Sequence, residues 1–589
     1  MNLKYKIAKK KISDISILIA GKAGDGVLFT GNVLAKILKR SGWEVATYRD
    51  FPSNIRGEPT SYSIRASLDK IYGRADEEDI LMAFDCQAIL KHRQRIAKRG
   101  VVFCDGQDIA QLVPQKREKV TYHKFPLRKL AKENFGHEIY KNMIALGGLS
   151  YILDLDLAII KRVIGETFLK KKGKEITQKN IDALCLGREK AKQVIQQEEC
   201  HALLRKTDGA RLLLSGDEAI ALGALAGGCR FFASYPICPA TEIFQYLAVH
   251  LPQHNGAVIQ TEDELAAINM ALGASYAGAR AMTATSGPGA SLMMEGFSLA
   301  GMAEIPLVVV HVQRTGPSTG MPTKTEQGDL NQWIYGSHGE FPRIVLAPGT
   351  VEECFEFTIK AFNLAEKYQC PVILMTEQDY AQNLRTVEEF DLSGIKIERG
   401  KLLYQKELLQ IKDFKRYEFT PDGVSPRAIP SMKNGIHMVE GNEHDERGYR
   451  NEDPGNRVKM MKKRMKKLKK ALKGVMPPRL WGRREAEIGI IGVGSTFGPI
   501  REAMNQLEKK EIQSKFLQLR TLWPFPGKKV EEFLKESREV FVVENNFTGQ
   551  LRNLVQSQTK SDVELRSIKK YSSLAFKPKE VSTPIQEMA

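Results

Sequence analysis

The sequence predicts an α/β protein of several domains, built from doubly wound sheets. Strand-like apolar runs alternate with helical patterns over most of the 589 residues, and this alternation is typical of parallel sheets covered by helices. At roughly 100–200 residues per domain, the length suggests about three or four domains. Apolar residues make up 42% of the chain, which is enough for each domain to bury a core.

The first segment, Ile15–Glu199, opens with the pattern of an α/β unit. The apolar run Ile15–Ala20 predicts a buried strand, Gly21–Gly26 predicts a tight turn, and apolar residues recurring over Leu28–Ile37 predict a helix. Further elements expected here are a strand at Val101–Cys104 and a charged helix at Lys170–Gln197 that leads out of the domain.

A second α/β segment starts near Gly209, and its strands alternate with helices rich in small residues. This order predicts a parallel, doubly wound sheet. The expected helices are Gly216–Gly227 and Glu264–Gly278, and the expected strands are Arg230–Ser234, Ala281–Thr285, Leu307–Val312, Ile344–Leu346 and Val372–Met375.

The pattern weakens from Asp391 to about Arg484, a stretch rich in charge, proline and glycine that we interpret as a connecting arm. Near its end, steps of three and four between apolar residues mark one face of a basic helix. Those residues are Val458, Met461, Met465, Leu468 and Leu472. A last α/β domain begins at Ile488–Val493 and continues with strands at Phe516–Leu519 and Val540–Val543.

The net charge of +18 is partly local, because Arg457–Lys473 is dense in lysine and arginine and has no acidic residue. A charge run of this kind is more often a solvated face than a binding surface, so the charge alone does not indicate a nucleic-acid binder. No apolar stretch approaches the roughly 20 residues of a membrane span. The short run Ile15–Ala20 resembles a strand rather than a signal peptide, which favours the cytoplasm.

The eight cysteines form no Cys-x-x-Cys pair, so the sequence predicts no metal or iron–sulfur site in this chain. Most of them are expected to be reduced and buried. Cys238 is the exception, because it lies in a motif that follows a strand.

The turn Gly21-x-x-Gly24-x-Gly26 stands between a strand and a helix, where main-chain N–H groups and the helix dipole favour anions. It is neither a dinucleotide fingerprint nor a P-loop. A phosphate-binding turn and a merely tight turn are both compatible with it.

Motifs follow several strands of the second segment, and ligands bind at the carboxyl ends of parallel strands. Tyr235-Pro-Ile-Cys-Pro-Ala-Thr-Glu242 predicts either a rigid turn or a substrate wall. The acids of Glu262-Asp-Glu264 open a helix, where the dipole alone can explain them. The small residues of Thr283–Gly289 let a flat ring approach the backbone, and Arg314 at a strand end suits bidentate carboxylate binding.

Taken in this order, the motifs resemble the α subunit of 2-oxoacid:ferredoxin oxidoreductases, and most closely the 2-oxoglutarate type. The first segment resembles the family's γ subunit, so γ and α look fused. The resemblance implies a γ-like domain at residues 1–200, a pyrimidine-binding thiamine diphosphate domain at 205–390, a connecting arm with a basic helix at 391–484, and a transketolase C-terminal-like domain at 485–589. The residues that support it are Tyr235–Pro239, Glu262–Glu264, Ala279–Gly289, Gln313–Gly320, Gly21–Gly26, Pro52–Gly57, Leu522–Pro526 and Glu544–Gln550.

The resemblance also implies residue roles in a coenzyme A-dependent oxidative decarboxylation, or the reverse carboxylation. Glu264 would contact N1′ of the cofactor's pyrimidine, with Glu262 as the second choice, beside Ser286 and Gly287. Arg314 would bind the substrate carboxylate. The other expected contacts are Tyr235 and Cys238 for the substrate, and Lys22, Gly24, Gly26 and Arg56 for coenzyme A.

Two departures from the family pattern matter. Family members usually have threonine where Cys238 stands, and a thiol is a weak donor, so the exact 2-oxoacid is open between 2-oxoglutarate, pyruvate and branched 2-oxoacids. Gly24-Asp25-Gly26, with Asn54 beyond it, is only a weak match to the metal motif of thiamine enzymes because it lies in the γ-like segment. The resemblance therefore implies a β subunit that supplies Mg²⁺ and the iron–sulfur cluster.

The expected partners are that β subunit, in an αβ hetero-oligomer, and ferredoxin, without a nucleic acid or a membrane. The basic helix can meet an acidic ferredoxin, coenzyme A or the β subunit. The alternative of another class is a non-catalytic assembly or coenzyme A-binding scaffold that kept the fold, and a third hypothesis is nucleic-acid binding through the lysines.

Overall fold

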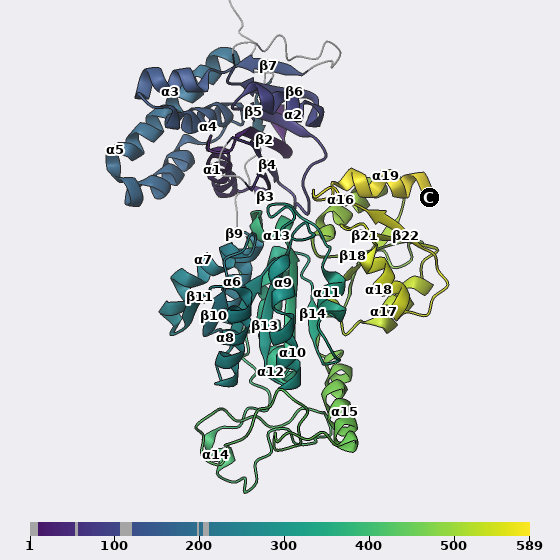
Figure 1. The fold of residues 1–589 in the computed structure, drawn as a ribbon. Helices are drawn as coiled ribbons and strands as arrows, with labels where there is room; N and C mark the ends of the chain where they lie inside the picture. The colour runs from purple at the N-terminus through teal and green to yellow at the C-terminus, as the bar shows by residue number, and fades with distance from the viewer. Residues whose placement is uncertain (1–9, 54–56, 107–119, 197–198, 204–210, 589) are drawn as a thin grey trace, which may run out of the picture. The chain divides into compact units, whose positions relative to one another are not determined.

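The chain folds into two compact units (Figure 1). The computed structural model describes residues 10–53, 57–106, 120–196, 199–203 and 211–588. Unit 1 comprises Met1–Leu214 and Asn383–Glu389, and unit 2 comprises Ser215–Gln382 and Phe390–Ala589. Helices cover sheets that combine parallel and antiparallel pairs, so the predicted α/β class is confirmed.

Unit 1 contains an eight-stranded sheet in the order β7-β6-β5-β2-β4-β3-β16-β9. Its strands are β2 (Asp14–Lys22), β3 (Glu44–Asp50), β4 (Pro59–Ser67), β5 (Glu78–Ala83), β6 (Ile96–Cys104), β7 (Thr121–Lys124), β9 (Arg211–Leu214) and β16 (Arg385–Glu388). Its helices are α1 (Val27–Arg40), α2 (Cys86–His92), α3 (Leu127–Phe135), α4 (Lys141–Ile152) and α5 (Leu157–Val194). A separate two-stranded sheet pairs β1 (Lys10–Ile12) with β8 (His201–Leu203).

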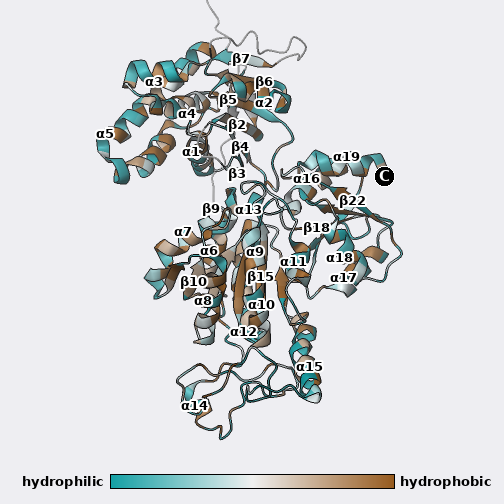
Figure 2. Cartoon of the chain, viewed as in Figure 1, coloured by the Kyte–Doolittle hydropathy of each residue, from teal (hydrophilic) through white to brown (hydrophobic). Residues whose placement is uncertain are grey.

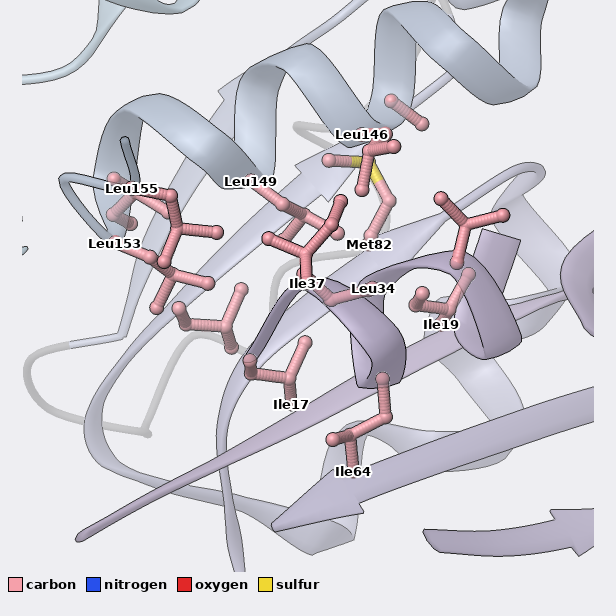
Figure 3. Close-up of a cluster of buried hydrophobic side chains, with 14 of the residues drawn as sticks. Ile17, Ile19, Leu34, Ile37, Ile64, Met82, Leu146, Leu149, Leu153 and Leu155 are labelled. Atoms are coloured by element: carbon pink, nitrogen blue, oxygen red, sulfur yellow. The ribbon is translucent and has the colours of Figure 1, made fainter. Parts of the chain in front are cut away.

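The core of unit 1 follows from the two-residue period of β2. Ile17 and Ile19 point to the face covered by α1 and α4, where they meet Leu34 and Leu146 (Figure 3). The intervening Leu18 faces the opposite side and belongs to a second buried cluster. Since both faces are buried, the strand is a continuous apolar run rather than an alternating one.

The sheet of unit 1 is completed by residues far along the chain. Strand β16 pairs antiparallel with both β3 and β9, so the chain leaves this sheet after Leu214 and returns to it at Arg385. Thr386 fixes the contact, because its hydroxyl accepts a hydrogen bond from Val45 N at 2.6 Å. No local pattern in the sequence indicates this return.

The first sheet of unit 2 has the order β11-β10-β12-β13-β15-β14-β20 and is parallel except for the pair β14–β20. Strands β13 and β15 are apolar and fully buried (Figure 2). The strands are β10 (Phe231–Ser234), β11 (Ala257–Gln260), β12 (Ala281–Thr285), β13 (Leu307–Gln313), β14 (Ile344–Leu346), β15 (Pro371–Glu377) and β20 (Thr521–Trp523). The helices are α6 (Gly216–Ala226), α7 (Thr241–His250), α8 (Glu264–Tyr276), α9 (Pro288–Leu292), α10 (Met294–Met302), α11 (Leu330–Tyr335), α12 (Val351–Tyr368) and α13 (Gln378–Gln382).

The second sheet of unit 2 has the order β17-β19-β18-β21-β22. One continuous apolar core joins it to the first sheet, since Val309 and Val345 belong to the same buried cluster as Ile491 and Val542. The strands are β17 (Arg479–Gly482), β18 (Ile488–Val493), β19 (Ser514–Leu519), β21 (Glu539–Glu544) and β22 (Leu565–Lys569), and the helices are α16 (Phe497–Glu508), α17 (Gly527–Lys535), α18 (Gln550–Gln558) and α19 (Pro578–Met588).

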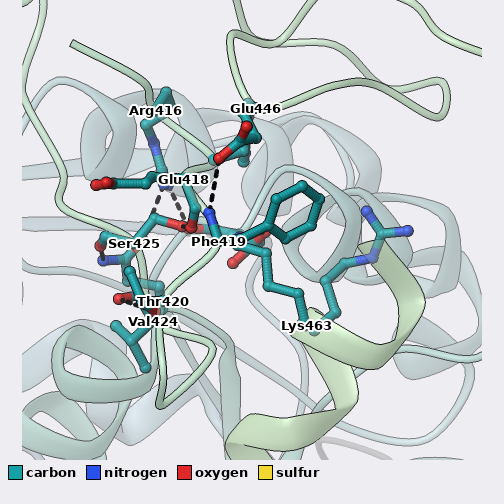
Figure 4. A network of polar contacts seen from close by, with 12 residues as sticks. Arg416, Glu418, Phe419, Thr420, Val424, Ser425, Glu446 and Lys463 are labelled. Atoms are coloured by element: carbon teal, nitrogen blue, oxygen red, sulfur yellow. Dashed lines mark hydrogen bonds and ion pairs between the residues drawn. The ribbon is translucent and has the colours of Figure 1, made fainter. Parts of the chain in front are cut away.

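The arm between the two sheets contains α14 (Gln405–Leu408) and α15 (Pro454–Ala471), and the rest is irregular chain held by polar contacts. Phe419 N–H donates to Glu446 at 3.0 Å, and the Ser425 hydroxyl donates to Glu418 O at 2.9 Å (Figure 4). These bonds satisfy main-chain groups that no sheet or helix pairs.

The helix expected within the arm is α15, but the apolar residues that mark one of its faces do not form the buried face. Val458 and Leu472 are 51% and 43% exposed. The buried face instead includes Lys463 and Lys467, both ion-paired with Glu304, the former at 2.6 Å. Burial opposes ionisation of Glu304, but the two ammonium groups outweigh it and hold the pKa of its carboxyl well below the usual range. The face of α15 that is buried is therefore the one that carries the ion-paired lysines, and not the one marked by apolar residues.

Among the described residues, every helix is too short or too polar to cross a lipid bilayer.

Candidate cofactor and substrate site

The predicted motifs of unit 2 meet at the carboxyl ends of β10, β12 and β13, which are parallel neighbours. The Arg314 guanidinium, after β13, donates from Nη1 to Cys238 O at 2.7 Å, after β10. Glu264, at the start of α8, lies against the loop that follows β12, because a Cβ placed on Gly289 would be 2.3 Å from Glu264 Oε1. Four segments of the chain thus converge at one sheet edge.

Glu264 is the first residue of α8 and is 5% exposed, whereas Glu262 is exposed. The preceding Asp263 caps the helix by accepting from Ala266 N at 2.7 Å. Burial raises the pKa of Glu264, and the charge of Asp263 adds to this, while its own backbone N–H and Arg314 oppose it. A buried carboxyl group thus lies at the start of α8, beside the loop that follows β12.

Glycines make room for the two charged side chains. A Cβ on Gly289 would also lie 2.2 Å from Thr285 Oγ1, so only glycine fits beside the Glu264 carboxylate. Gly287 has φ +48°, and a Cβ there would lie 2.9 Å from Arg314 Nε. The small residues thus accommodate Glu264 and Arg314, a role that the sequence pattern did not indicate.

Buried hydroxyl groups surround the loop after β12. Within the described part of the chain, no hydrogen-bond partner is found for Oγ of Ser286 or for Oγ1 of Thr283 and Thr285, although these side chains are fully buried. Such groups cost free energy unless a ligand or a partner surface satisfies them. Thr285 lies beside Glu264 at Gly289, so unsatisfied hydroxyl groups at this edge fit a polar ligand.

Arg314 is 5% exposed and is held by two main-chain carbonyls. Besides Cys238 O, it reaches Thr319 O from Nη2 at 3.1 Å, and burial lowers its pKa. Its buried Nε has no partner among the described residues, so donors remain for an anion. Cys238 meets Arg314 through its main chain, and Tyr235 is 40% exposed.

A second candidate site lies in unit 1 at the glycine turn. A pocket of about 390 Å³ is lined by Lys22, Gly24, Gly26, Phe29 and Phe51, among others. Both glycines have positive φ, 97° and 82°, which explains their residue type. Arg56, expected here, and Asn54 lie outside the described residues.

Asp25, between those glycines, is engaged by cations of its own unit. Its carboxylate accepts from Lys141 Nζ at 2.6 Å and pairs with Arg128 at 3.3 Å. Burial opposes ionisation, but Lys141, the Lys22 N–H and Arg128 together lower the pKa of Asp25. This arrangement disfavours the weak metal-motif hypothesis, and no group of three or more His, Cys, Asp or Glu among the described residues can hold a metal.

The sequence missed residues that support the Arg314 loop. His311, on β13, contacts Asp329 at 2.8 Å through Nε2, and Gln327, near the end of the loop, is fully buried. Both are polar side chains that lie in or after a buried apolar strand, and this pattern can be seen in the sequence. The pattern does not show which residues they contact.

The comparisons identify the class of α/β protein to which this fold and site belong. Residues 222–463 match the family "Pyruvate flavodoxin/ferredoxin oxidoreductase, thiamine diP-bdg". Residues 16–190 match "Pyruvate ferredoxin/flavodoxin oxidoreductase", and residues 486–581 match "Pyruvate:ferredoxin oxidoreductase core domain II".

The chain belongs to the 2-oxoacid:ferredoxin oxidoreductase family, as an alpha subunit, which confirms the resemblance. Subunit alpha of 2-oxoacid:ferredoxin oxidoreductase 2 from Aeropyrum pernix is 33% identical over 93% of each chain. The 2-oxoglutarate synthase subunit KorA of Methanothermobacter marburgensis is 35% identical over 64% of this chain and 98% of its own. The solved 2-oxoglutarate:ferredoxin oxidoreductase of Magnetococcus marinus, with 2-oxoglutarate, coenzyme A and succinyl-CoA bound, has a TM-score of 0.91 at 36% identity and covers 98% of this chain and 99% of its own.

Proposed function

We propose that this chain is the α subunit, with a fused γ domain, of an enzyme that decarboxylates 2-oxoglutarate oxidatively, or forms it by the reverse reaction, with coenzyme A and ferredoxin. The solved relative contains 2-oxoglutarate, coenzyme A and succinyl-CoA, and another relative is a 2-oxoglutarate synthase subunit. The same reaction on pyruvate or branched 2-oxoacids is the alternative within the family.

The buried Glu264 is the single observation on which this proposal depends. When bound, thiamine diphosphate supplies a nucleophilic carbon and an electron sink for decarboxylation. Glu264 holds a proton at N1′ of the pyrimidine by accepting a hydrogen bond on its buried carboxylate. The unsatisfied hydroxyl of Ser286 and the main chain of Gly287 line the same place. These residues fit a flat, polar ring.

Arg314 binds the carboxylate of the 2-oxoacid. A guanidinium has five N–H donors, and the two carbonyl contacts leave some of them for the substrate. The carbonyls of Cys238 and Thr319 fix its direction, so little side-chain entropy is lost on binding. Tyr235 and Cys238 form the adjoining wall.

Coenzyme A binds at the glycine turn of unit 1. Lys22 is exposed beside Gly24 and Gly26, and Phe29 and Phe51 give the pocket apolar walls. Asp25 does not repel an anion because Lys141 and Arg128 neutralise it. We expect Lys22→Ala to raise the KM for coenzyme A and leave the KM for the 2-oxoacid unchanged, and equal changes in both would contradict this assignment.

A β subunit completes the enzyme by supplying Mg²⁺, the iron–sulfur cluster and the route to ferredoxin. The described part of this chain offers no metal cluster of its own. The proposal therefore assigns to this chain the pyrimidine side of the cofactor and the substrate carboxylate.

The deciding experiment is Glu264→Gln in the purified α–β complex. We expect turnover to fall by roughly 10²–10⁴-fold, the usual range for a lost acid–base group, while the complex stays assembled. Glu295→Gln, at an exposed position on α10, is the matched control. Unchanged turnover in Glu264→Gln would favour the non-catalytic scaffold, and a loss in Glu262→Gln alone would move the role to that residue.

A further inference from the structure

The loop that presents Arg314 runs from the end of β13 to the start of α11, and its base is closed by polar contacts. Asp329 N–H donates to Gln313 Oε1 at 3.1 Å, and the Asp329 carboxylate contacts His311 Nε2 at 2.8 Å. Within the loop, Thr315 N–H donates to Lys324 O at 3.1 Å, so its two arms are joined. These contacts tie the two arms of the loop to each other and to the end of β13.

Gln327, near the end of this loop, is fully buried and bonded to the second sheet of unit 2. Its main-chain N–H donates to Asn545 O at 2.7 Å, and its Oε1 accepts from Asn545 N at 3.0 Å. Its Nε2 donates to Glu377 Oε1 at 2.7 Å and to Val493 O at 2.9 Å. One side chain thus joins the ends of β15 and β18 and the segment after β21.

Two further residues of the motif Glu544–Gln550 hold the neighbouring loop backbone. Asn546 Nδ2 donates to Gln327 O at 3.2 Å, and Gln550 Nε2 donates to Gly328 O at 2.7 Å. Gln550 Oε1 also accepts from Asn331 N at 3.0 Å. We call Asn545, Asn546 and Gln550 the clasp.

Asn546 is itself fixed in the orientation that the clasp requires. Its Nδ2 donates to Glu544 Oε2 at 2.8 Å, and its Oδ1 accepts from Gly549 N at 2.8 Å. The clasp is therefore preorganised by its own domain before it meets the loop.

We propose that the clasp positions Arg314 for the 2-oxoacid carboxylate, so that the C-terminal domain sets substrate affinity without touching the substrate. The connection runs from Gln327 through the joined arms of the loop to Thr319 O, which accepts from Arg314 Nη2. Gln327, Asn546 and Gln550 are positioning residues in this account. The inference rests on the proposed role of Arg314.

The test uses Gln550→Ala in the assembled α–β complex. Gln550 lies at the start of α18, and removing its side chain deletes the bonds to Gly328 and Asn331 without emptying the core. Because the loop then loses two of its hydrogen bonds to the clasp, we expect the KM for the 2-oxoacid to rise about fivefold or more. Turnover and the KM for coenzyme A are expected to stay within twofold.

Matched variants separate positioning from a general structural role. Gln550→Glu keeps an acceptor for Asn331 N and loses the donor to Gly328 O, so its KM is expected between those of the wild type and Gln550→Ala. Asn553→Ala, on the same helix, deletes only an exposed bond to Thr548 O and is expected to behave as the wild type.

The outcomes distinguish the clasp from the proposed function. An unchanged KM in Gln550→Ala overturns the clasp, and so does a KM that rises equally for the 2-oxoacid and coenzyme A. Arg314→Lys tests the underlying assignment separately, because lysine lacks the guanidinium fork. If Arg314→Lys leaves the KM for the 2-oxoacid unchanged, the role of Arg314 fails whatever Gln550→Ala does.

Discussion

Glu304 and Lys467 form an ion pair in which neither side chain is exposed to solvent. Lys463 completes the contact from one turn earlier on α15, at 2.6 Å. Two lysines and one glutamate thus dock the connecting arm against the end of α10. A buried charge is tolerated here because its opposite charges are buried with it.

Removing the acid should destabilise this contact strongly. Glu304→Gln leaves Lys463 and Lys467 buried without a counter-charge, and breaking a buried pair in this way costs about 3–5 kcal/mol. We expect a lower midpoint of denaturant unfolding for unit 2. Lys462→Gln, on the exposed face of the same helix, is the control, and equal midpoints for the two variants would contradict the prediction.

Glu377 should make stability depend on pH. Burial raises its pKa from 4.5 to about 8, against the bonds from Gln327 and Ser495 N. A carboxyl whose pKa is higher in the folded state stabilises the fold below the unfolded value and loses that contribution as the pH rises to the folded value. We therefore expect the Tm of the wild type to fall relative to that of Glu377→Gln between about pH 5 and pH 8. A Tm difference that does not vary with pH would show that Glu377 is ionised throughout.

Gly289→Ala should impair the cofactor site specifically. The added Cβ would lie 2.3 Å from Glu264 Oε1, so the carboxylate must move. Because each 1.4 kcal/mol lost in the transition state reduces the rate about tenfold, we expect at least a tenfold loss of turnover. Gly165→Ala, on α5, adds a Cβ in open space and should leave turnover unchanged. Wild-type turnover in Gly289→Ala would refute a fixed Glu264.

Cys238→Thr tests the departure from the family pattern. A hydroxyl donates more strongly than a thiol, and one added hydrogen bond of about 1 kcal/mol corresponds to about a fivefold lower KM. We expect this change for the preferred 2-oxoacid in a panel of 2-oxoglutarate, pyruvate and branched 2-oxoacids. The KM for coenzyme A serves as the internal control, and a uniform change over the whole panel would argue against a specific contact at position 238.

The sequence predicted what depends on local pattern. The runs Ala281–Thr285 and Ile488–Val493 are strands over the expected residues, because each is a short buried run that alternates with helical segments along the chain. It also placed Glu264 and Arg314 in segments that the structure brings together, since parallel strand ends share one edge. It failed where long-range electrostatics decided the result, as at Lys463 and Lys467, because nothing near α15 in the sequence reveals Glu304 as their partner.

The clasp shows a second reason why prediction from the sequence was incomplete. Gln327 and Asn545 are more than 200 residues apart, and their bonds are largely to main-chain atoms, which leave no pattern in the side chains. The motif Glu544–Gln550 could be recognised in the sequence, but the loop residues that it contacts could not. The pairing of β16 with β9 escaped prediction for the same reason.

That pairing has a consequence for how the molecule can be divided. Because β16 closes the sheet of unit 1 between β3 and β9, a polypeptide cut after Leu214 would lack an interior strand and keep a terminal one with nothing to pair against. An excised N-terminal fragment is thus an incomplete fold with an unpaired strand edge that can pair with other chains. Expression of this part as a separate protein would require Asn383–Glu389 to be grafted back onto it.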